Sequence, residues 1–164
     1  MAILDSGHIF QKDWEMPNAG TDICDYYYDW TASKWKDWIN TPQPLWIIVT
    51  CTGVPSAGTS IKVEIYQHST STLTSGDLLI EGPIVVRANL AADPYDDGHI
   101  LLAVPFATCM QAAQIMGGQD RYFGPVLRAD GDCSSGQVDA WVHMGVNPPV
   151  YVAPPSSSNV VMPS

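Results

Sequence analysis

The run from residue 93 to residue 99, Asp-Pro-Tyr-Asp-Asp-Gly-His, has the side chains of a cation site. Carboxylate oxygens are good ligands for Ca²⁺, and a calcium loop of the EF-hand type needs oxygen ligands at its third and twelfth positions. Counted from Asp93, these positions hold Tyr95 and Val104. We therefore interpret this run as a surface turn and predict no metal site there.

Other polar residues are spread along the chain without the spacing of a catalytic centre. Asp130 and Asp132 lie among glycine and serine, where aspartate is also an ordinary turn residue. His68 and His143 are far apart, and nothing pairs the two carboxylates that a glycosidase holds roughly 5–10 Å apart. The sequence also lacks a glycine-rich phosphate loop with lysine, a Gly-x-Ser-x-Gly motif and a His-Glu-x-x-His motif. We predict a protein that is not an enzyme.

The four cysteines, Cys24, Cys51, Cys109 and Cys133, are widely spaced. They form no Cys-x-x-Cys motif and no Cys/His pair with the spacing of zinc ligands. The sequence therefore favours buried thiols over a zinc site. A disulfide stays open if the surroundings of the protein are oxidising.

The composition indicates one domain with a hydrophobic core. The chain has 164 residues, of which 46% are hydrophobic, and its net charge is −10. Seven basic against seventeen acidic side chains disfavour direct binding to nucleic acid, which needs cations to neutralise phosphates. No apolar run approaches the roughly 20 residues of a membrane span, and the N-terminus lacks a basic segment followed by an apolar one. We expect a soluble, unsecreted protein that does not bind membranes.

Thirteen glycines and thirteen prolines separate short apolar runs, which is typical of an all-β antiparallel sandwich. Residues 45–52 form a continuous apolar run and are predicted to be a central strand. Residues 59–67 alternate, which predicts a strand buried on one face, and we expect the two strands to pair. The alternation places Ile61, Val63 and Ile65 on one face and Lys62, Glu64 and Tyr66 on the other.

Further elements follow between residues 78 and 118. A strand over 78–86 contains Pro83, which indicates a sheet edge or a bulge. Residues 89–98 are interpreted as a loop and 100–104 as a short strand. Residues 107–116 are predicted to form a helix, capped by Thr108 and ended by two glycines.

Residues 119–144 show the most regular pattern of the chain. Two runs rich in β-branched and aromatic residues, 121–129 and 137–144, flank a connection of turn-forming residues. This arrangement predicts an antiparallel hairpin. In its second strand, Asp139, Trp141 and His143 are expected on one face and Val138, Ala140 and Val142 on the other.

The two ends of the chain differ from the middle. Residues 1–10 suggest an extended arm, and residues 11–40 are dense in tryptophan and tyrosine, which favours subunit contacts. Residues 146–164 are rich in proline and carry no charge, which predicts an extended C-terminal arm after a β-sandwich domain at 1–145. The candidate contact residues in these segments are Trp14, Tyr27, Trp30, Trp35, Trp38, Tyr151, Val160 and Val161.

The order of several short motifs resembles a family of tailed-phage capsid cement (decoration) proteins. The series comprises an opening Met-Ala-Ile-Leu-Asp5, Leu45-Trp-Ile-Ile-Val49, Ala57-Gly-Thr-Ser-Ile-Lys-Val63, Glu81-Gly-Pro83, Ile100-Leu-Leu-Ala-Val-Pro105, Asp120-Arg-Tyr-Phe-Gly124 and Gly136-Gln-Val-Asp-Ala-Trp141. It covers about residues 1–144. The most specific part is Arg121-Tyr-Phe-Gly124 followed by Gly136-x-Val-x-Ala-Trp141, and the residues that carry it are Arg121, Tyr122, Gly124, Gly136, Ala140 and Trp141.

The resemblance implies a jelly-roll β-sandwich on the outer surface of an icosahedral head. Such a protein bridges neighbouring major capsid subunits, binds no cofactor and associates with itself as a dimer or trimer on local symmetry axes. It is found in the host cytoplasm before assembly and on the virion afterwards. The aromatic segment 13–38, the helix at 107–116 and the tail 145–164 depart from the family pattern.

Two other functions remain open at this point. Exposed tryptophans at positions 14, 30, 35 and 38 would suit a β-sandwich that binds carbohydrate or a host receptor, and the same architecture occurs in tail or neck proteins. Within the hairpin, Arg121 is expected to be a positioned strand residue, paired with an acidic neighbour such as Asp120 or Asp139 across the pair.

Overall fold

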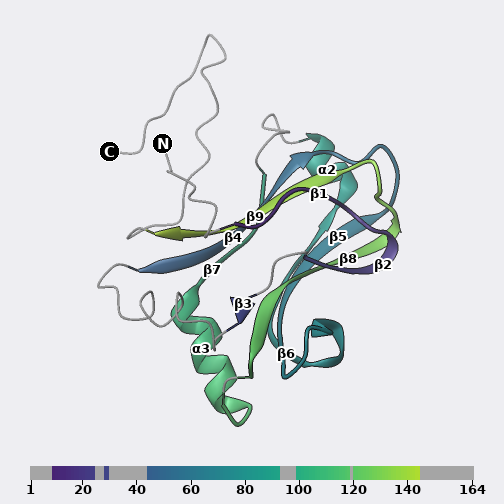
Figure 1. The fold of residues 1–164 in the computed structure, drawn as a ribbon. Coiled ribbons are helices and arrows are strands. Elements are labelled where there is room, and N and C mark those ends of the chain that lie inside the picture. Colours follow the sequence, from purple (N-terminus) through teal and green to yellow (C-terminus); the bar gives the residue numbers. More distant parts are fainter. Residues whose placement is uncertain (1–8, 25–27, 30–43, 93–98, 119, 145–164) are drawn as a thin grey trace, which may run out of the picture.

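The computed structural model describes residues 9–24, 28–29, 44–92, 99–118 and 120–144, and these residues form two antiparallel sheets packed face to face (Figure 1). Within these described ranges, two α-helices and one short 3-10 helix lie outside the sheets. The elements in chain order are β1 (Ile9–Glu15), β2 (Asn18–Ile23), β3 (Tyr28–Asp29), β4 (Leu45–Gly53), β5 (Ser60–His68), η2 (Leu73–Ser75), β6 (Asp77–Val86), α2 (Arg87–Ala92), β7 (His99–Pro105), α3 (Phe106–Ile115), β8 (Tyr122–Asp132) and β9 (Gln137–Met144).

The strand order is that of a jelly roll. The first sheet has the order β1-β9-β4-β7, and the second has the order β2-β8-β5-β6, with β3 also paired to β8. When the two-residue β3 is left out and strands are counted from the two ends, β1 matches β9, β2 matches β8, β4 matches β7 and β5 matches β6, and the two strands of each match are antiparallel neighbours. A long hairpin rolled into two sheets gives this pattern. The expected all-β sandwich of the jelly-roll type, with a short helix inserted, is therefore confirmed.

The core lies between the two sheets, and β4, β5 and β9 contribute alternate residues to it. On β5, Ile61, Val63 and Ile65 are at most 1% exposed, as their alternation predicts. From β8, the Phe123 ring packs edge-on against Phe106 at 5.7 Å between ring centres, and it lies 6.3 Å from the Phe10 ring. Such tilted contacts between aromatic rings are favourable and join β1, β8 and the start of α3.

The predicted hairpin at residues 119–144 is wrong in its pairing. Both of its strands exist, as β8 and β9, but β8 pairs with β2, β3 and β5 while β9 pairs with β1 and β4. The turn between them carries the chain from one sheet to the other. The expected pair β4 and β5 is wrong for the same reason, because these strands also lie in different sheets. Alternation fixes the face of a strand but does not select its neighbour.

Helix α3 is confirmed within a residue of its predicted ends, but its predicted cap is wrong. Thr108 lies inside the helix, and Pro105 occupies the N-cap position without a side-chain hydrogen bond. At the other end, Gly118 N–H donates to Ala113 O at 2.9 Å and Gly117 N–H donates to Gln114 O at 3.3 Å. Both glycines have positive φ, so the predicted glycine stop is a Schellman motif.

The edges of the sheets agree with the proline pattern. Strand β6 lies at the edge of its sheet, and its pairing with β5 shifts register between Lys62 and Glu64 and again between Ile65 and Tyr66. Pro83 falls at the first of these shifts, so its missing N–H breaks no hydrogen bond between inner strands. The predicted loop at 89–98 begins differently, because residues 87–92 form α2. Among the residues that the structure describes, no helix has the length and hydropathy needed to cross a membrane.

Gly58 closes the turn before β5 at a close approach to β8. Its φ is +88°, and a Cβ added there would lie 2.4 Å from Cys133 Sγ and 2.9 Å from Asp132 O. Gly20 has nearly the same φ, +85°, but an added Cβ would meet nothing within 4 Å. We therefore expect Gly58→Ala to lower the free energy of unfolding by roughly 1–3 kcal/mol more than Gly20→Ala does, since both changes strain the backbone and only the first overpacks. Urea titration of the two variants measures this difference, and equal losses would contradict it.

Candidate interaction surfaces

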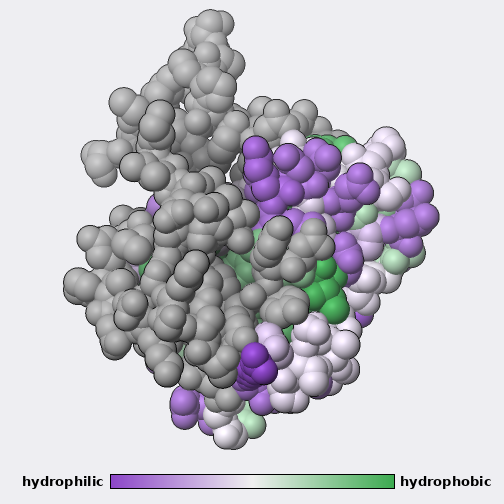
Figure 2. Space-filling view, in the orientation of Figure 1, coloured by the Kyte–Doolittle hydropathy of each residue, from purple (hydrophilic) through white to green (hydrophobic). Residues whose placement is uncertain are grey.

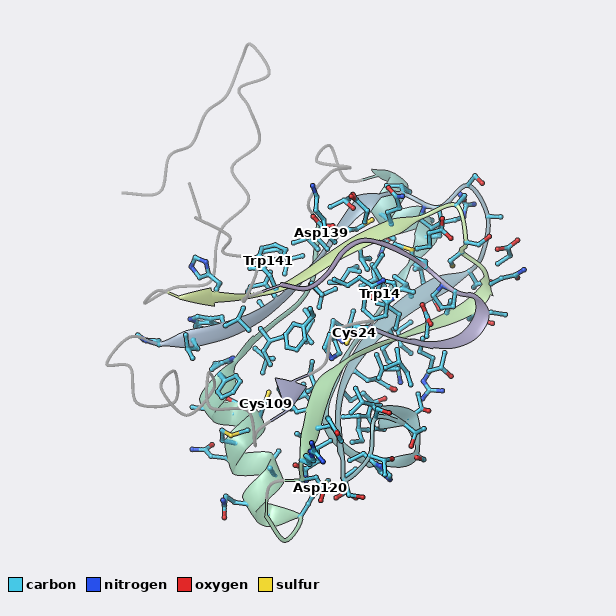
Figure 3. All side chains as sticks on the ribbon, viewed as in Figure 1. Trp14, Cys24, Cys109, Asp120, Asp139 and Trp141 are labelled. Atoms are coloured by element: carbon cyan, nitrogen blue, oxygen red, sulfur yellow. The ribbon has the colours of Figure 1, made fainter. Side chains whose placement is uncertain are left out.

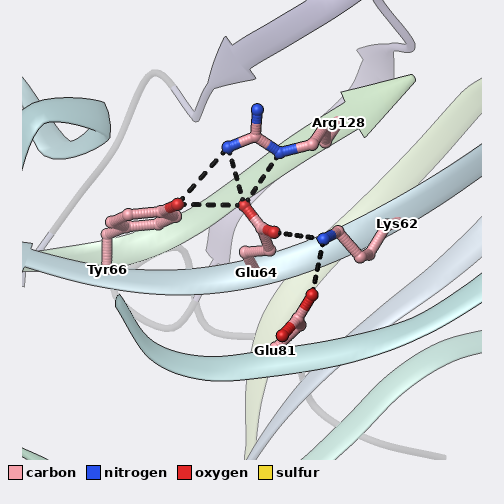
Figure 4. A network of polar contacts seen from close by, with 5 residues as sticks. All are labelled: Lys62, Glu64, Tyr66, Glu81 and Arg128. Atoms are coloured by element: carbon pink, nitrogen blue, oxygen red, sulfur yellow. Dashed lines mark hydrogen bonds and ion pairs between the residues drawn. The ribbon is translucent and has the colours of Figure 1, made fainter. Parts of the chain in front are cut away.

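The outer face of the second sheet carries a cluster of charged side chains. Lys62 and Glu64 alternate with the core residues of β5 and so point away from the other sheet. The register places Arg128 of β8 opposite Lys62 on one side and Glu81 of β6 opposite Glu64 on the other. Tyr66 follows on the same face of β5. These five residues form what we call the charged cluster (Figure 4).

Glu64 is the centre of the charged cluster. Its side chain is only 3% exposed, yet its carboxylate has partners on both sides. Arg128 Nε and Nη2 donate to Glu64 Oε2 at 3.1 and 3.0 Å, and the Tyr66 hydroxyl donates to the same oxygen at 3.1 Å. Lys62 Nζ lies 2.6 Å from Glu64 Oε1 and donates to Glu81 Oε1 at 2.8 Å. The buried carboxylate is thus compensated by two cations.

Burial and pairing act on Glu64 in opposite directions. Burial alone would raise the pKa of the Glu64 carboxyl, because it disfavours the charged form. The hydrogen bonds from Lys62 and Arg128 outweigh this effect and hold the pKa below its ordinary value of 4.5. The same bonds raise the pKa of Lys62 and of Arg128. All three groups are therefore charged at neutral pH.

This lowered pKa predicts how stability changes in acid. The unfolded chain takes up the Glu64 proton before the folded chain does, so the stability from the ionised carboxylate is complete above about pH 5 and is lost as the pH falls through the folded pKa. We expect the difference in free energy of unfolding between the wild-type protein and Glu64→Gln to be constant at neutral pH and to shrink below about pH 4.5. Urea titrations across this range measure it, because the other carboxylates are common to both proteins. A difference that does not change with pH would contradict the pairing.

Next to the charged cluster, a small apolar cluster covers the same outer face. Leu73 of η2 is fully buried against Tyr66 and Val126. Hydrogen bonds hold the loop that carries Leu73. Thr70 N–H donates to His68 Nδ1 at 3.0 Å, and the Thr70 and Thr72 hydroxyls lie 2.7 Å apart. Figure 2 shows the near-neutral surface over this loop, with hydrophilic residues gathered instead over β1. The loop therefore adds a second, smaller apolar cluster on the outer face of the sheet.

Large apolar side chains are exposed at two places in the described residues. On β6, Ile84 is 68% exposed and Val86 is 40% exposed, beside the charged cluster. At the end of α3, Ile115 is 86% exposed and Met116 is 49% exposed. These are the positions where a partner would remove the most apolar surface from water.

Trp14 does not belong to such a surface, and its prediction as a contact residue is wrong. Its side chain is 1% exposed and lies between the sheets (Figure 3). Its indole N–H donates to Asp22 Oδ2 at 2.7 Å. The cause is an irregular β1, which shifts register twice against β9 and holds Asp13 at a φ of 50°. Asp13 N–H donates to Asp139 Oδ1 at 2.8 Å and fixes this bulge.

The other candidate contacts lie outside the described residues. This group comprises Tyr27, Trp30, Trp35, Trp38, Tyr151, Val160 and Val161. The extended arm at 146–164 and most of the arm at 1–10 lie outside them as well, as does the Asp-rich run at 93–98. These predictions stay predictions.

The motif residues all lie on or beside β8 and β9, which are inner strands of the two sheets. Tyr122 and Gly124 belong to β8, and Ala140 and Trp141 belong to β9, whose inward residues Val138, Ala140 and Val142 are buried as predicted. Gly136 lies in the turn between the sheets. A Cβ added to Gly136 would come within 2.6 Å of Met16 Sδ and 3.0 Å of Pro55, so a larger residue there would displace the buried Met16 side chain. The motif therefore contributes to the architecture of the roll.

Arg121 does not pair with Asp139 across a hairpin, because β8 and β9 are not neighbours. Figure 3 shows Asp139 and Asp120, the residue before Arg121, at opposite ends of the sandwich. The Arg121 guanidinium carbon lies 4.9 Å from the centre of the Tyr122 ring, a cation–π distance. Arg128 is the arginine that pairs with a buried acid.

The described residues contain no group of three His, Cys, Asp or Glu side chains that could hold a metal ion. Asp132 instead accepts hydrogen bonds from the Ser134 N–H and hydroxyl at 3.0 and 2.6 Å, which makes it a turn residue. All four cysteines are buried and none is in a disulfide. Burial raises the pKa of Cys109 to about 12, so its thiol is protonated and unreactive at neutral pH.

Gln67 is a positioning residue that the sequence did not single out. It is 1% exposed, and its amide donates to Gly118 O at 3.1 Å and accepts from Asp120 N–H at 3.2 Å. It thereby ties the segment after α3 to β5. The signal available in the sequence was a polar residue at the end of an alternating strand, which is too common to interpret.

Comparison with known proteins does not identify the chain. No protein-family model matches it, and no curated protein matches its sequence.

Proposed function

We propose that this protein is a structural component of a tailed-phage virion, which decorates the outside of an icosahedral head and cements neighbouring major capsid subunits. It acts without chemistry of its own. Its partners are the major capsid protein and other copies of itself.

One observation carries this proposal. The two most specific motifs of the resemblance lie at the starts of β8 and β9. These motifs are Arg121-Tyr-Phe-Gly124 and Gly136-x-Val-x-Ala-Trp141, and each of the two strands is an inner strand of its sheet. The jelly roll is common among viral structural proteins, although the same fold hosts lectins and enzymes. It is the coincidence of fold and motif position that supports a virion role.

The surface of the sandwich is consistent with binding to a repeated scaffold. The charged cluster fixes side chains of three neighbouring strands on a rigid sheet, and apolar side chains are exposed at the end of α3. Modest contacts of this kind give tight attachment when one protein contacts several subunits at once. A net charge of −10 keeps unassembled copies soluble and away from DNA.

The test is binding to heads assembled from the major capsid protein that the same genome encodes. Purified full-length protein is mixed with heads that lack it, and the heads are sedimented. We expect saturable binding in a fixed ratio to the major capsid subunit, and heads that resist heating better when saturated. Failure to sediment with heads would overturn the proposal, and saturation at a few copies per particle would indicate a tail or neck protein instead.

A further inference from the structure

Helix α3 ends in an apolar tip that projects from the sandwich. Figure 1 shows α3 at one end of the molecule, with its C-terminal end pointing away from both sheets. Ile115 and Met116 lie at this end, and Ile115 is the most exposed large apolar side chain in the described residues. A single exposed apolar side chain is ordinary on a protein surface. Two further properties of the tip indicate that it is a binding surface.

The first property is the absence of charge. The chain has seven basic and seventeen acidic side chains, yet the sequence from Phe106 to Gly118 contains none of them. Besides Ile115, the solvent-facing positions of α3 are alanine, threonine and glutamine, namely Ala107, Thr108, Gln111 and Gln114. Charged residues are depleted at the centre of protein interfaces, and methionine is enriched there. The end of α3 thus combines an exposed methionine with a lack of charge on an otherwise acidic protein.

The second property is rigid presentation. Phe106, Cys109 and Ala113 anchor one side of the helix in the core. The Schellman hydrogen bonds fix its last turn, and the buried Gln67 holds the chain on the far side of the two glycines. A side chain held in place before binding loses little freedom on binding, so an exposed isoleucine on such a support is suited to recognition.

We propose that Ile115 and Met116 insert into an apolar pocket on the major capsid subunit, whose rim offers uncharged hydrogen-bonding groups to Gln111 and Gln114. This inference rests on the proposed function. The pocket is placed on a different protein and not on a second copy, because a helix about 15 Å long cannot alone supply the roughly 1,200 Å² that a stable dimer buries. Attachment to a head does not need this area in one contact, since several contacts act together.

The other exposed apolar site is less suited to this role and therefore serves as a control. Ile84 is also a largely exposed isoleucine, but it lies on the edge strand β6, directly opposite Lys62 of the charged cluster. Ile84→Asp and Ile115→Asp are therefore matched changes at the two exposed apolar sites of the described residues. Both side chains face solvent, so neither change should disturb folding, which circular dichroism and thermal melting verify.

The experiment compares the wild-type protein, Ile115→Asp, Ile115→Leu and Ile84→Asp in sedimentation with heads. We expect Ile115→Asp to bind at least about tenfold more weakly, because it places a charge in an apolar pocket, and the other two variants to bind as the wild type does. Wild-type binding with unchanged affinity for Ile115→Asp would overturn this inference and leave the proposed function standing. If the wild-type protein does not bind heads, the proposed function itself fails.

Self-association gives a second readout. Sedimentation velocity of the free proteins is expected to show the same oligomeric state for the wild type and for Ile115→Asp. If Ile115→Asp converts an oligomer into a monomer, the tip binds another copy and the capsid pocket is wrong.

Discussion

Replacing Trp14 with alanine is expected to lower the free energy of unfolding by about 3–5 kcal/mol, the cost of removing a large aromatic side chain from a packed core. Trp14 is 1% exposed, lies between the sheets and joins β1 to β2 through its hydrogen bond to Asp22. Urea denaturation of the purified variant measures the change. A residue that only served as a contact on the surface would show almost no effect.

Two variants separate the parts of this effect. Trp14→Phe keeps most of the apolar volume and loses the indole N–H, so we expect a loss of about 1–2 kcal/mol. Ile84→Ala removes an exposed apolar side chain and is expected to change stability by less than about 0.5 kcal/mol. If Trp14→Ala were as mild as Ile84→Ala, the position of β1 in the roll would be wrong.

Replacing Lys62 and Arg128 together with methionine is expected to lower the free energy of unfolding at pH 7 by about 3 kcal/mol. The change leaves the Glu64 carboxylate buried without a cation. The estimate is taken at the low end for a broken buried pair, because Arg128 is 43% exposed and water screens part of its interaction. Urea titration provides the measurement.

The control for this variant removes the acid as well. Lys62→Met, Glu64→Leu and Arg128→Met combined leave no buried charge, and such replacements are often neutral or stabilising. We therefore expect the triple variant to recover most of the loss. A double variant as stable as the wild type would show that Glu64 does not depend on its two cations.

The sequence predicts the faces of strands well and their partners poorly. Alternation along β5 places Ile61, Val63 and Ile65 in the core, and alternation along β9 does the same for Val138, Ala140 and Val142. The pairing of β8 with β5 and of β9 with β4 joins segments far apart in the chain, and no local pattern encodes it. A short turn between two strands was therefore interpreted as a hairpin, although in a jelly roll it crosses between sheets.

The same limit applies to the candidate surfaces. The outward direction of Lys62, Glu64 and Tyr66 was predictable, but the burial of Glu64 depends on Arg128, which follows 64 residues later in the chain. The burial of Trp14 depends on a bulge at Asp13, whereas its prediction as a contact residue relied only on the density of tryptophan and tyrosine in residues 11–40. The exposed tip of α3 depends on where Phe106, Cys109 and Ala113 anchor the helix. Each of these features comes from contacts between distant residues.

The most direct test of the virion role is a cryo-electron microscopy reconstruction of heads before and after saturation with the full-length protein. The proposed function predicts added density on the outer surface, into which the two sheets fit, at sites that bridge neighbouring major capsid subunits. The inferred contact predicts that the end of α3 points into the capsid. Density confined to the neck or tail, or no added density at saturating concentration, would contradict the assignment.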